Sequence, residues 1–315
     1  MQKVTIVIPN YNGRRLLENC LKTLENQTYT DFKVLIIDNG STDGSKEIIS
    51  DTLDMEMVSL ETNLGFCGAV NLGIQMTNTP YIILLNNDTE TDRYFVETLL
   101  KAIERSEKIF SCGAQMIDFQ NHKILDNAGD LYTAMGWAVA RGKGKRCIDY
   151  EKKKRVFSCC AGAAIYRMDI LNQIGGLDEH HFAYLEDVDL GYRARIHGFE
   201  NWYIPEAKVY HVGRATTGAR YNEKKVFLAA RNTIFVIYKN MPVLQLALNV
   251  PFIFTGMLIK TLFFVRKGFG EDYCKGILEG ICDCKKCWKV KFRMKNLSNY
   301  FKIQLELWCN LVRII

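Results

Sequence analysis

The chain has 315 residues, of which 48% are hydrophobic and 24% charged, with only 5 prolines. This ordinary globular composition excludes intrinsic disorder, a collagen-like repeat and a small disulfide-stapled scaffold. The net charge of +6 is too small to predict a nucleic-acid-binding protein, but it is unevenly spread. Residues 260–315 carry twelve Lys/Arg and five Asp/Glu, whereas residues 1–259 are close to neutral.

The first 120 residues alternate short β-rich runs with helical patterns. Strands are expected at 4–9, 33–38, 55–60 and 81–86, and helices after Gly13, over 44–53 and over 68–77. Such alternation predicts right-handed crossovers and a mainly parallel sheet, with the ligand at the carboxyl ends of the strands. The polar or glycine-rich segments NYNG, DNGSTDGS, TNLGFCG and NNDTE follow those four strands and should converge on one edge.

The second half of the body is less regular. Residues 121–156 are interpreted as an irregular surface insertion, with a lid or an acceptor contact as the alternative, and a strand is expected over 156–167. A helix should begin near Glu186, because acidic residues favour the first turn and basic residues the last. Two short strands at 201–205 and 207–211, and a helix over 221–239, complete a body of residues 1–240.

The remaining residues, 241–315, are predicted to form a helical, basic appendage. Met241–Ile259 contains nineteen residues and no charge, and basic residues follow it closely. An apolar helix with a cationic flank is typical of a segment lying in an anionic membrane surface, which is the favoured interpretation. A plain packing helix or dimer surface, and a true membrane span, are the alternatives.

Cysteine usage gives little further information. The N-terminus lacks the apolar run of a signal peptide, so the eleven cysteines are expected to be reduced and mostly to pack as small core residues. Cys282, Cys284 and Cys287 could bind zinc, but a structural zinc site normally has a second pair of ligands, and none follows.

Four weak signals carry chemistry. Asp88 ends a buried strand and could hold a divalent cation against phosphates, or simply form a turn. Asp38 could accept hydrogen bonds from a ligand, or form an Asx turn. Glu186 and Asp187 could supply a general base, or only cap a helix. His211 would be a credible metal ligand if its strand ends near Asp88.

The order of these signals gives them more weight. The stretches VTIVIPNYNG, VLIIDNGSTDGS, NLGFCGAVNLGI, YIILLNNDTE, the run from CCAGAAIYR to LEDVDLGYRARIHGF, and VYHVGRATTG span residues 4 to about 217. In this order they resemble the inverting family-2 glycosyltransferases with the GT-A fold, and within them the bacterial rhamnosyltransferase-like branch. The resemblance implies an α/β fold, with a Rossmann-like, mainly parallel central sheet flanked by helices and a C-terminal helical appendage.

The resemblance also implies roles for individual residues. Residues 1–240 would be the catalytic domain, with Asp187 as the catalytic base and Glu186 either supporting it or contacting the acceptor. A divalent cation, Mg²⁺ or Mn²⁺, would be held by Asp88 and His211, although Asn86 replaces the first acid of the family's Asp-x-Asp motif. The nucleotide sugar would be bound by Pro9, Tyr11, Asp38, Asn63, Gly65, Asn71 and Asn87, with Asp38 reading a pyrimidine ring.

The function implied is transfer of a sugar from a UDP- or dTDP-linked donor to a hydroxyl of a saccharide or lipid-linked acceptor, in cell-surface polysaccharide synthesis. The protein would be cytoplasmic and peripheral on the cytoplasmic face of the membrane, would not bind nucleic acid, and could form a homo-oligomer. A sugar-phosphate nucleotidyltransferase is the nearest other enzyme, but its basic glycine-rich loop after the first strand is missing. A non-catalytic membrane-bound relative is disfavoured by the intact NND and LEDVD stretches.

Overall fold

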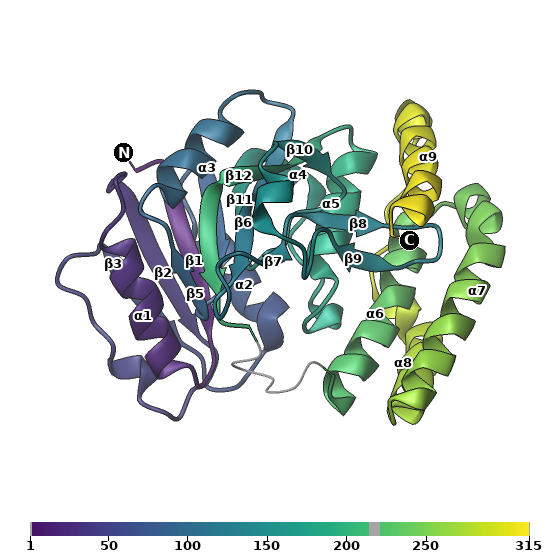
Figure 1. Ribbon diagram of the computed structural model, residues 1–315, viewed down its shortest axis with the longest axis horizontal. Coiled ribbons are helices and arrows are strands. Elements are labelled where there is room, and N and C mark those ends of the chain that lie inside the picture. The colour runs from purple at the N-terminus through teal and green to yellow at the C-terminus, as the bar shows by residue number, and fades with distance from the viewer. Residues whose placement is uncertain (1, 214–220, 315) are drawn as a thin grey trace.

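The computed structural model describes residues 2–213 and 221–314, which are built around a ten-stranded mixed sheet (Figure 1). Its main strand order is β10-β12-β6-β11-β4-β1-β2-β3, with β5 pairing to β12 and β7 to β6. The strands are β1 (Val4–Asn10), β2 (Phe32–Asp38), β3 (Met55–Ser59), β4 (Tyr81–Leu85), β5 (Thr89–Thr91), β6 (Ile109–Asp118), β7 (Leu125–Asn127), β10 (Lys154–Val156), β11 (Ala163–Arg167) and β12 (Glu200–His211).

The N-terminal half has the predicted parallel topology. Strand β1 lies parallel to both β2 and β4, and β2 lies parallel to β3. Because β4 is buried at all five positions, it is apolar throughout, as expected of a strand covered on both faces. Helices α1 (Arg14–Leu24) and α3 (Phe95–Ile103) pack on one face of the sheet.

The opposite face of the sheet is covered by α2 (Gly65–Met76), α4 (Met168–Ile174) and α5 (Glu186–Ile196). Helix α5 begins at Glu186, which confirms the start expected from the acids in its first turn. Strand β11 runs antiparallel between β4 and β6, while β6 and β12 pair in parallel, so the sheet is parallel at its centre and mixed beyond β4.

Several predicted elements were wrong. The helix over 44–53 is a single 3₁₀ turn, η1 (Ser45–Glu47), because this segment has too few inward-facing apolar side chains to form a longer helix. The strand over 156–167 is two strands, since β10 pairs with β12 whereas β11 lies beside β4. The two strands at 201–205 and 207–211 are one strand, β12, whose register shifts between Ile204 and Lys208 around Pro205.

The predicted surface insertion at 121–156 is also largely buried over residues 125–136. It contributes β7 and a separate hairpin of β8 (Asp130–Tyr132) and β9 (Ala138–Ala140), followed by the 3₁₀ helix η2 (Cys147–Tyr150). This hairpin reaches the C-terminal helices, where Ala134 N–H donates to the Leu307 carbonyl at 3.2 Å and Asn310 Nδ2 donates to the Tyr132 carbonyl at 2.9 Å.

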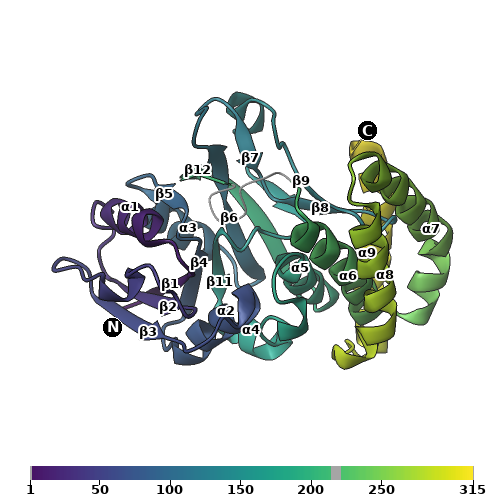
Figure 2. The same cartoon turned by 90° about the horizontal axis from the view of Figure 1, so that it is seen from below.

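The chain ends in α6 (Glu223–Asn240), α7 (Val243–Arg266), α8 (Gly270–Asp283) and α9 (Leu297–Arg313). Helices α7, α8 and α9 gather at one end of the molecule, opposite α1 and β3 (Figure 2). They share a hydrophobic cluster with the body, in which Tyr192 of α5 and Val236 of α6 pack with Ile253 of α7 and Ile303 of α9. The appendage is therefore joined to the body by a common core.

Helix α7 has an unusual distribution of side chains. Its buried positions are Gln245, Asn249, Ile253 and Gly256, so the inward stripe is partly polar. Gln245 Oε1 accepts a hydrogen bond from the Tyr192 hydroxyl at 2.9 Å, and Asn249 exchanges two hydrogen bonds with Gln304 of α9. The exposed face is apolar instead, and it includes Val243, Leu244, Leu248, Val250, Phe254, Leu258, Ile259, Leu262 and Val265.

A buried cluster of charges joins α5, α6 and the segment before α5. Lys239 is fully buried, and its Nζ lies 2.7 Å from Asp178 Oδ2 and 3.0 Å from Asp189 Oδ2. Arg193 Nε also donates to Asp189 Oδ2 at 3.0 Å, and Asn240 Nδ2 donates to Asp189 Oδ1 at 2.7 Å. The cluster holds two acids and two bases, so the buried charges balance.

Removing one partner should leave buried charge uncompensated. We expect Lys239→Ala to lower the free energy of unfolding by about 3–5 kcal/mol, because Asp178 and Asp189 would lose their shared cation. The measurement is the midpoint of urea unfolding at neutral pH. The matched control is the exposed Lys152→Ala, which should change stability by less than about 0.5 kcal/mol. Equal midpoints for the two variants would contradict the role given to Lys239.

Candidate active site

The carboxyl ends of β1, β2 and β4 meet through side-chain amides. Asp38 is buried, its Oδ1 accepts a hydrogen bond from Asn10 Nδ2 at 3.0 Å, and its Oδ2 accepts one from the Ser41 N–H at 3.0 Å. Asn87 Nδ2 in turn donates to Asn10 Oδ1 at 2.6 Å. Asn10 was not predicted as a site residue, although its position at the carboxyl end of β1 could have indicated it. It links two of the predicted donor-binding residues.

Glycine is required where the chain leaves β1. A Cβ on Gly13 would lie 2.3 Å from Asn87 Nδ2 and 3.0 Å from Asn10 Oδ1, so a larger residue would disturb this amide contact. Tyr11, just before it, is 41% exposed at the same edge, and Pro9 is half-buried within β1. The structure therefore places Pro9 and Tyr11 at the sheet edge where Asp38 and Asn87 lie.

Asn63 and Gly65 lie beside the end of β2, held by Asn39. Asn39 Nδ2 donates to Asn63 Oδ1 at 3.0 Å and to the Gly65 carbonyl at 2.9 Å, while its Oδ1 accepts from the Leu64 N–H at 2.8 Å. Gly65 has a φ of +76°, and a Cβ there would lie 2.6 Å from Phe182. The glycine is needed both for its backbone conformation and for this approach of the turn before α5.

Asn71 has a different environment from the other predicted donor-binding residues. Its Oδ1 accepts from the Leu177 N–H at 2.9 Å, and its Nδ2 donates to the Leu177 carbonyl at 2.8 Å and to Glu179 at 3.0 Å. This amide holds α2 against the segment between α4 and α5. Its predicted contact with the ribose or diphosphate stays a prediction.

Asp88 and His211 are brought together by the pairing of β5 with β12. His211 lies opposite Thr89 in that ladder, and its Nε2 is 3.4 Å from Asp88 Oδ1. The other ring nitrogen, Nδ1, lies 2.8 Å from Asp126 Oδ2. Burial lowers the pKa of His211, but the hydrogen bonds to Asp126 and Asp88 outweigh this effect and raise it to about 9.

The chemistry of this pair fits a divalent cation. A carboxylate oxygen and an imidazole nitrogen 3.4 Å apart can both reach one ion at about 2.0–2.2 Å after a small adjustment. Asp126 contacts the second ring nitrogen of His211, as acceptors beside metal-bound histidines commonly do. Asp126 was not identified from the sequence, because it lies 85 residues from His211 and only the packing of β7 beside β6 brings it there.

The turn before α5 has a strained backbone. Phe182, Tyr184 and Leu185 have φ values of +62°, +74° and +67°, a region that non-glycine residues rarely adopt. Fully buried Asn232 of α6 holds this turn, because its Nδ2 donates to the carbonyls of His181, Ala183 and Tyr184 at 2.9, 2.8 and 2.8 Å. This turn leads directly into α5, whose first two residues are Glu186 and Asp187.

Glu186 and Asp187 belong to a group of three acids in a poorly solvated environment. Burial raises the pKa of Asp187, and burial together with the neighbouring Asp187 charge raises the pKa of Glu186 to about 8. Glu186 Oε2 is buried and has no hydrogen-bond partner among the described residues. Such an environment favours proton exchange near neutral pH, as a general base requires.

Asp130 is the third acid, and no motif in the sequence pointed to it. It is buried at the start of β8, where its Oδ1 accepts from Asn127 at 2.8 Å and its Oδ2 from Ser158 at 3.2 Å. Burial and the charge of Asp187 raise the pKa of Asp130 to about 8. At neutral pH at least one of the three acids is therefore expected to carry a proton.

One short turn connects the base with the cation-binding side. Burial raises the pKa of Asp187, and the Ala161 N–H opposes this by stabilising the charged carboxylate. The neighbouring Gly162 carbonyl accepts a hydrogen bond from the Asn86 N–H at 2.9 Å. A Cβ on Gly162 would lie 2.9 Å from the Asn86 side chain. Asp187 and Asn86, two residues before Asp88, thus lie beside the same 160–162 turn.

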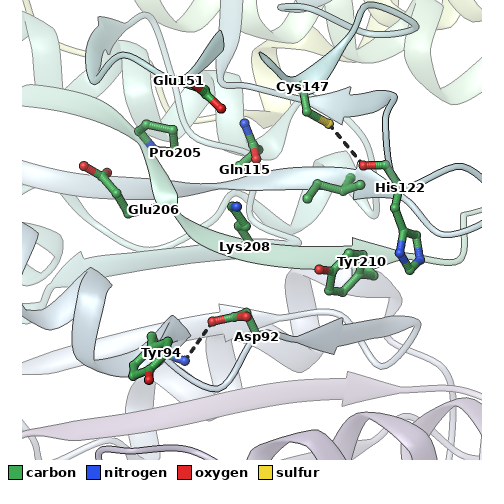
Figure 3. A pocket seen from close by; sticks show the side chains of 11 residues that line it. Asp92, Tyr94, Gln115, His122, Cys147, Glu151, Pro205, Glu206, Lys208 and Tyr210 are labelled. Atoms are coloured by element: carbon green, nitrogen blue, oxygen red, sulfur yellow. Dashed lines mark hydrogen bonds between the residues drawn. The ribbon is translucent and has the colours of Figure 1, made fainter. Parts of the chain in front are cut away.

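A separate cavity of about 490 Å³ lies between β5, β6, β12 and η2 (Figure 3). It is lined by acids such as Asp92 and Glu206 together with Lys208 and the aromatic rings of Tyr94 and Tyr210. None of the residues predicted individually for the donor, the cation or the base lines it, but His122, Cys147 and Glu151 come from the 121–156 segment, for which an acceptor contact was the alternative interpretation. The predicted site is therefore an open edge of the sheet, distinct from this cavity.

Comparison with known proteins identifies the family. Residues 5–175, more than half of the chain, match the model of glycosyl transferase family 2. The chain is 26% identical over 264 residues to an N-acetylglucosaminyl-diphospho-decaprenol L-rhamnosyltransferase of Mycobacterium tuberculosis, covering 72% of this chain and 84% of that protein. It is also 26% identical over 220 residues to the O-antigen chain rhamnosyltransferase RfbN of Salmonella typhimurium, covering 66% of each.

Among solved structures, the fold resembles that of GalNAc-T7, described with UDP, GalNAc and Mn²⁺, with a TM-score of 0.61 at 14% identity. The aligned part covers 75% of this chain and 48% of that one, so this likeness concerns the fold alone. With the family match and the GT-A-like sheet in agreement, the chain belongs to glycosyltransferase family 2, and two of its relatives there are named rhamnosyltransferases.

Proposed function

We propose that this protein is an inverting, cation-dependent glycosyltransferase that moves a sugar from a UDP- or dTDP-linked donor to a hydroxyl of a lipid-linked saccharide. The observation that carries the proposal is the approach of two groups on one sheet edge. These are the half-buried acid Asp187, whose pKa is raised by burial, and the Asp88–His211 pair, which both lie beside the 160–162 turn. They provide a base and a cation site on the two sides of a reacting sugar.

The relatives support this choice of substrates. The Mycobacterium protein is named for a decaprenyl-diphosphate-linked acceptor, and RfbN for O-antigen chains, so saccharides of the cell surface are the acceptor class we propose. GalNAc-T7, which has a similar fold, is described with UDP and Mn²⁺, so a nucleotide sugar and a divalent cation are the donor and cofactor classes we propose. Asp38, buried between Asn10 and Ser41, would contact the base of the nucleotide.

The reaction would be a single displacement. The bond between the anomeric carbon and the diphosphate oxygen breaks while the acceptor oxygen bonds to that carbon from the opposite face, which inverts the configuration. The acceptor hydroxyl proton passes to Asp187, within the hydrogen-bond reach that a general base requires. A cation held by Asp88 and His211 would neutralise the charge on the leaving diphosphate.

Membrane association is a further part of the proposal. Helix α7 is long enough to span a membrane, and its most apolar stretch of 18 residues has a mean hydropathy of 1.7, with only 17% of that stretch buried. Its inward stripe is, however, bound to α5 and α9 through Gln245 and Asn249, and Gly256 packs closely against Met135 and Trp137. A spanning α7 would draw these parts of the body into the hydrocarbon. We therefore propose that α7 lies in the cytoplasmic membrane surface with its apolar face toward lipid.

Charge supports an anionic lipid surface rather than a neutral one. Lys291, Arg293 and Lys295 are exposed and alternate with exposed Phe292 and Met294. Cationic side chains interleaved with apolar ones are suited to anionic headgroups above an acyl layer. A lipid-linked acceptor would be presented in the same layer.

Asp187→Asn tests the catalytic base. The substitution keeps the shape of the side chain but removes its ability to take a proton, so transfer should fall by at least about 100-fold while donor affinity stays within about twofold. The measurements are turnover of a UDP- or dTDP-sugar with a polyprenyl-diphosphate saccharide, and calorimetric binding of the donor. The exposed Asp169→Asn is the matched control. Full turnover by the Asp187 variant would exclude this residue as the base.

Asp88→Ala tests the cation site. Removing a carboxylate ligand should raise the Mn²⁺ concentration needed for half-maximal donor binding by about 10–100-fold. Donor binding would be titrated with Mn²⁺ in the parent protein, in this variant and in Asp92→Ala, which alters the separate cavity instead. The role of Asp88 fails if the parent and Asp88→Ala curves coincide, or if Asp92→Ala shifts the curve equally.

The combined variant Leu244→Ser, Phe254→Ser, Leu262→Ser tests the membrane surface. These side chains are exposed on α7, so the fold should persist while affinity for vesicles of phosphatidylglycerol and phosphatidylcholine falls roughly 10- to 100-fold. Flotation with vesicles is the measurement, and Ile49→Ser with Ile148→Ser, exposed on the body, is the control. Unchanged flotation would refute the assignment, as would a soluble parent dimer that the α7 variant converts to monomer.

A further inference from the structure

Three side chains of metal-binding type lie close together between the segment before α5 and the segment after α8. Asp178, His180 and Cys287 each offer one ligand atom, and these three atoms all lie within 4.8 Å of one another. Asp178 and His180 belong to the segment before α5, with Oδ1 and Nδ1 only 2.9 Å apart, whereas Cys287 follows α8 more than 100 residues later. Asp178 and Cys287 are each 3% exposed, and His180 is exposed.

This set of ligands suits zinc better than the cation of the transfer reaction. Zinc binds thiolate at about 2.3 Å, imidazole nitrogen at about 2.0–2.1 Å and carboxylate oxygen at about 2.0–2.2 Å in a tetrahedron. Neighbouring ligand atoms are then roughly 3.3–3.6 Å apart. A bound ion would draw atoms that lie within 4.8 Å of one another to these separations, and a water would complete the tetrahedron. Mg²⁺ prefers oxygen ligands and would not select the thiol.

The surrounding charges leave one oxygen of Asp178 for a metal. Lys239 Nζ contacts only Oδ2, at 2.7 Å, whereas Oδ1 accepts a hydrogen bond from the His180 N–H at 3.1 Å and has a second lone pair for His180 Nδ1, 2.9 Å away, or for an ion. Lys239 is itself neutralised by Asp189 at 3.0 Å, which reduces its repulsion of a second cation. Burial raises the pKa of the Cys287 thiol to about 12, so a bound ion must displace the thiol proton into solvent.

The neighbouring cysteines do not join this group. Cys282 is exposed, and Cys284 Sγ contacts the Ile281 carbonyl at 3.3 Å. Of the three clustered cysteines, Cys287 alone is buried and lies with Asp178 and His180. The sequence argued against zinc because no second pair of ligands follows Cys287. In the structure, Asp178 and His180 from the segment before α5 supply that pair.

We propose that Asp178, His180 and Cys287 bind one Zn²⁺ ion, completed by a water, and that this ion joins the segment after α8 to the turn that positions Asp187. This site is separate from Asp88 and His211, and it does not depend on the proposed transfer reaction.

The full-length protein, stripped with a chelator and dialysed, would be titrated with Co²⁺ and with Zn²⁺. The first equivalent of Co²⁺ bound at the thiolate site should produce a thiolate-to-cobalt charge-transfer band in the near ultraviolet, which Zn²⁺ should remove, whereas Co²⁺ at Asp88 and His211 has no thiolate and adds nothing to this band. Cys287→Ser should lose the band, and His180→Gln, a change at an exposed side chain, should weaken Zn²⁺ binding by at least about tenfold. Cys284→Ser and Asp88→Ala should keep both.

Absence of the charge-transfer band in the folded parent protein would overturn the proposal, as would persistence of the band in Cys287→Ser. A band that disappears in Cys284→Ser but not in His180→Gln would assign the thiolate to a different site and also reject it. Circular dichroism of each variant shows whether it is folded, and His180→Gln supplies the decisive comparison if Cys287→Ser is not. Loss of transferase activity in Asp187→Asn leaves all of these readouts unchanged.

Discussion

The buried ion cluster around Lys239 is the constraint on which the rest of the site depends. Asp189 is fully buried and would be costly alone, but Arg193, Lys239 and Asn240 satisfy both of its oxygens. Because Asp189 lies two residues after Asp187 on α5 and Lys239 lies on α6, neither helix can shift without exposing a buried charge. The cluster therefore fixes the start of α5 relative to the C-terminal helices.

This rigidity explains how an unfavourable turn persists next to the candidate base. Three non-glycine residues with positive φ before Glu186 would cost of order 1–3 kcal/mol each in isolation. The Asn232 side chain offsets that cost by hydrogen bonding to three carbonyls of the turn, and Arg231 adds bonds to His180 and His181. Because the ion cluster fixes α5 relative to α6, the turn cannot relax to a lower-energy conformation without breaking these hydrogen bonds.

The parallel half of the fold was predictable because its signals are local. Strands β1, β2 and β4 agree with the expected ranges to within one residue, since each is an apolar run ended by polar residues. The expected helix at 44–53 failed because its apolar residues do not share one face: Ile48 is buried, whereas Ile49 is 82% exposed. Strand β12 was split in two because Pro205 looks like a terminator, although a register shift accommodates it.

The predicted site residues at strand ends were brought to one edge for the same reason, since parallel strands end together. Asp38, Asn87 and Asp88 lie where the alternation of strands and helices required. Their partners could not be read in the same way. Asp126 and Asp130 come from an insertion interpreted as surface, and tertiary packing alone brings them to His211 and Asp187. Asn232 and Lys239 lie in a helix whose sequence resembles any amphipathic segment.

The reversed polarity of α7 connects the site with the proposed membrane surface. Helix α7 turns Gln245 and Asn249 inward and most of its apolar side chains outward. In water, this orientation buries less apolar surface, and so stabilises the fold less, than the opposite orientation would. The arrangement is favourable once lipid covers the outer face, since the inward amides are already hydrogen bonded to Tyr192 and Gln304. Tyr192 belongs to the same helix as Asp187. In the proposed membrane-bound state, the depth of α7 would therefore set the height of the base above the lipid that carries the acceptor.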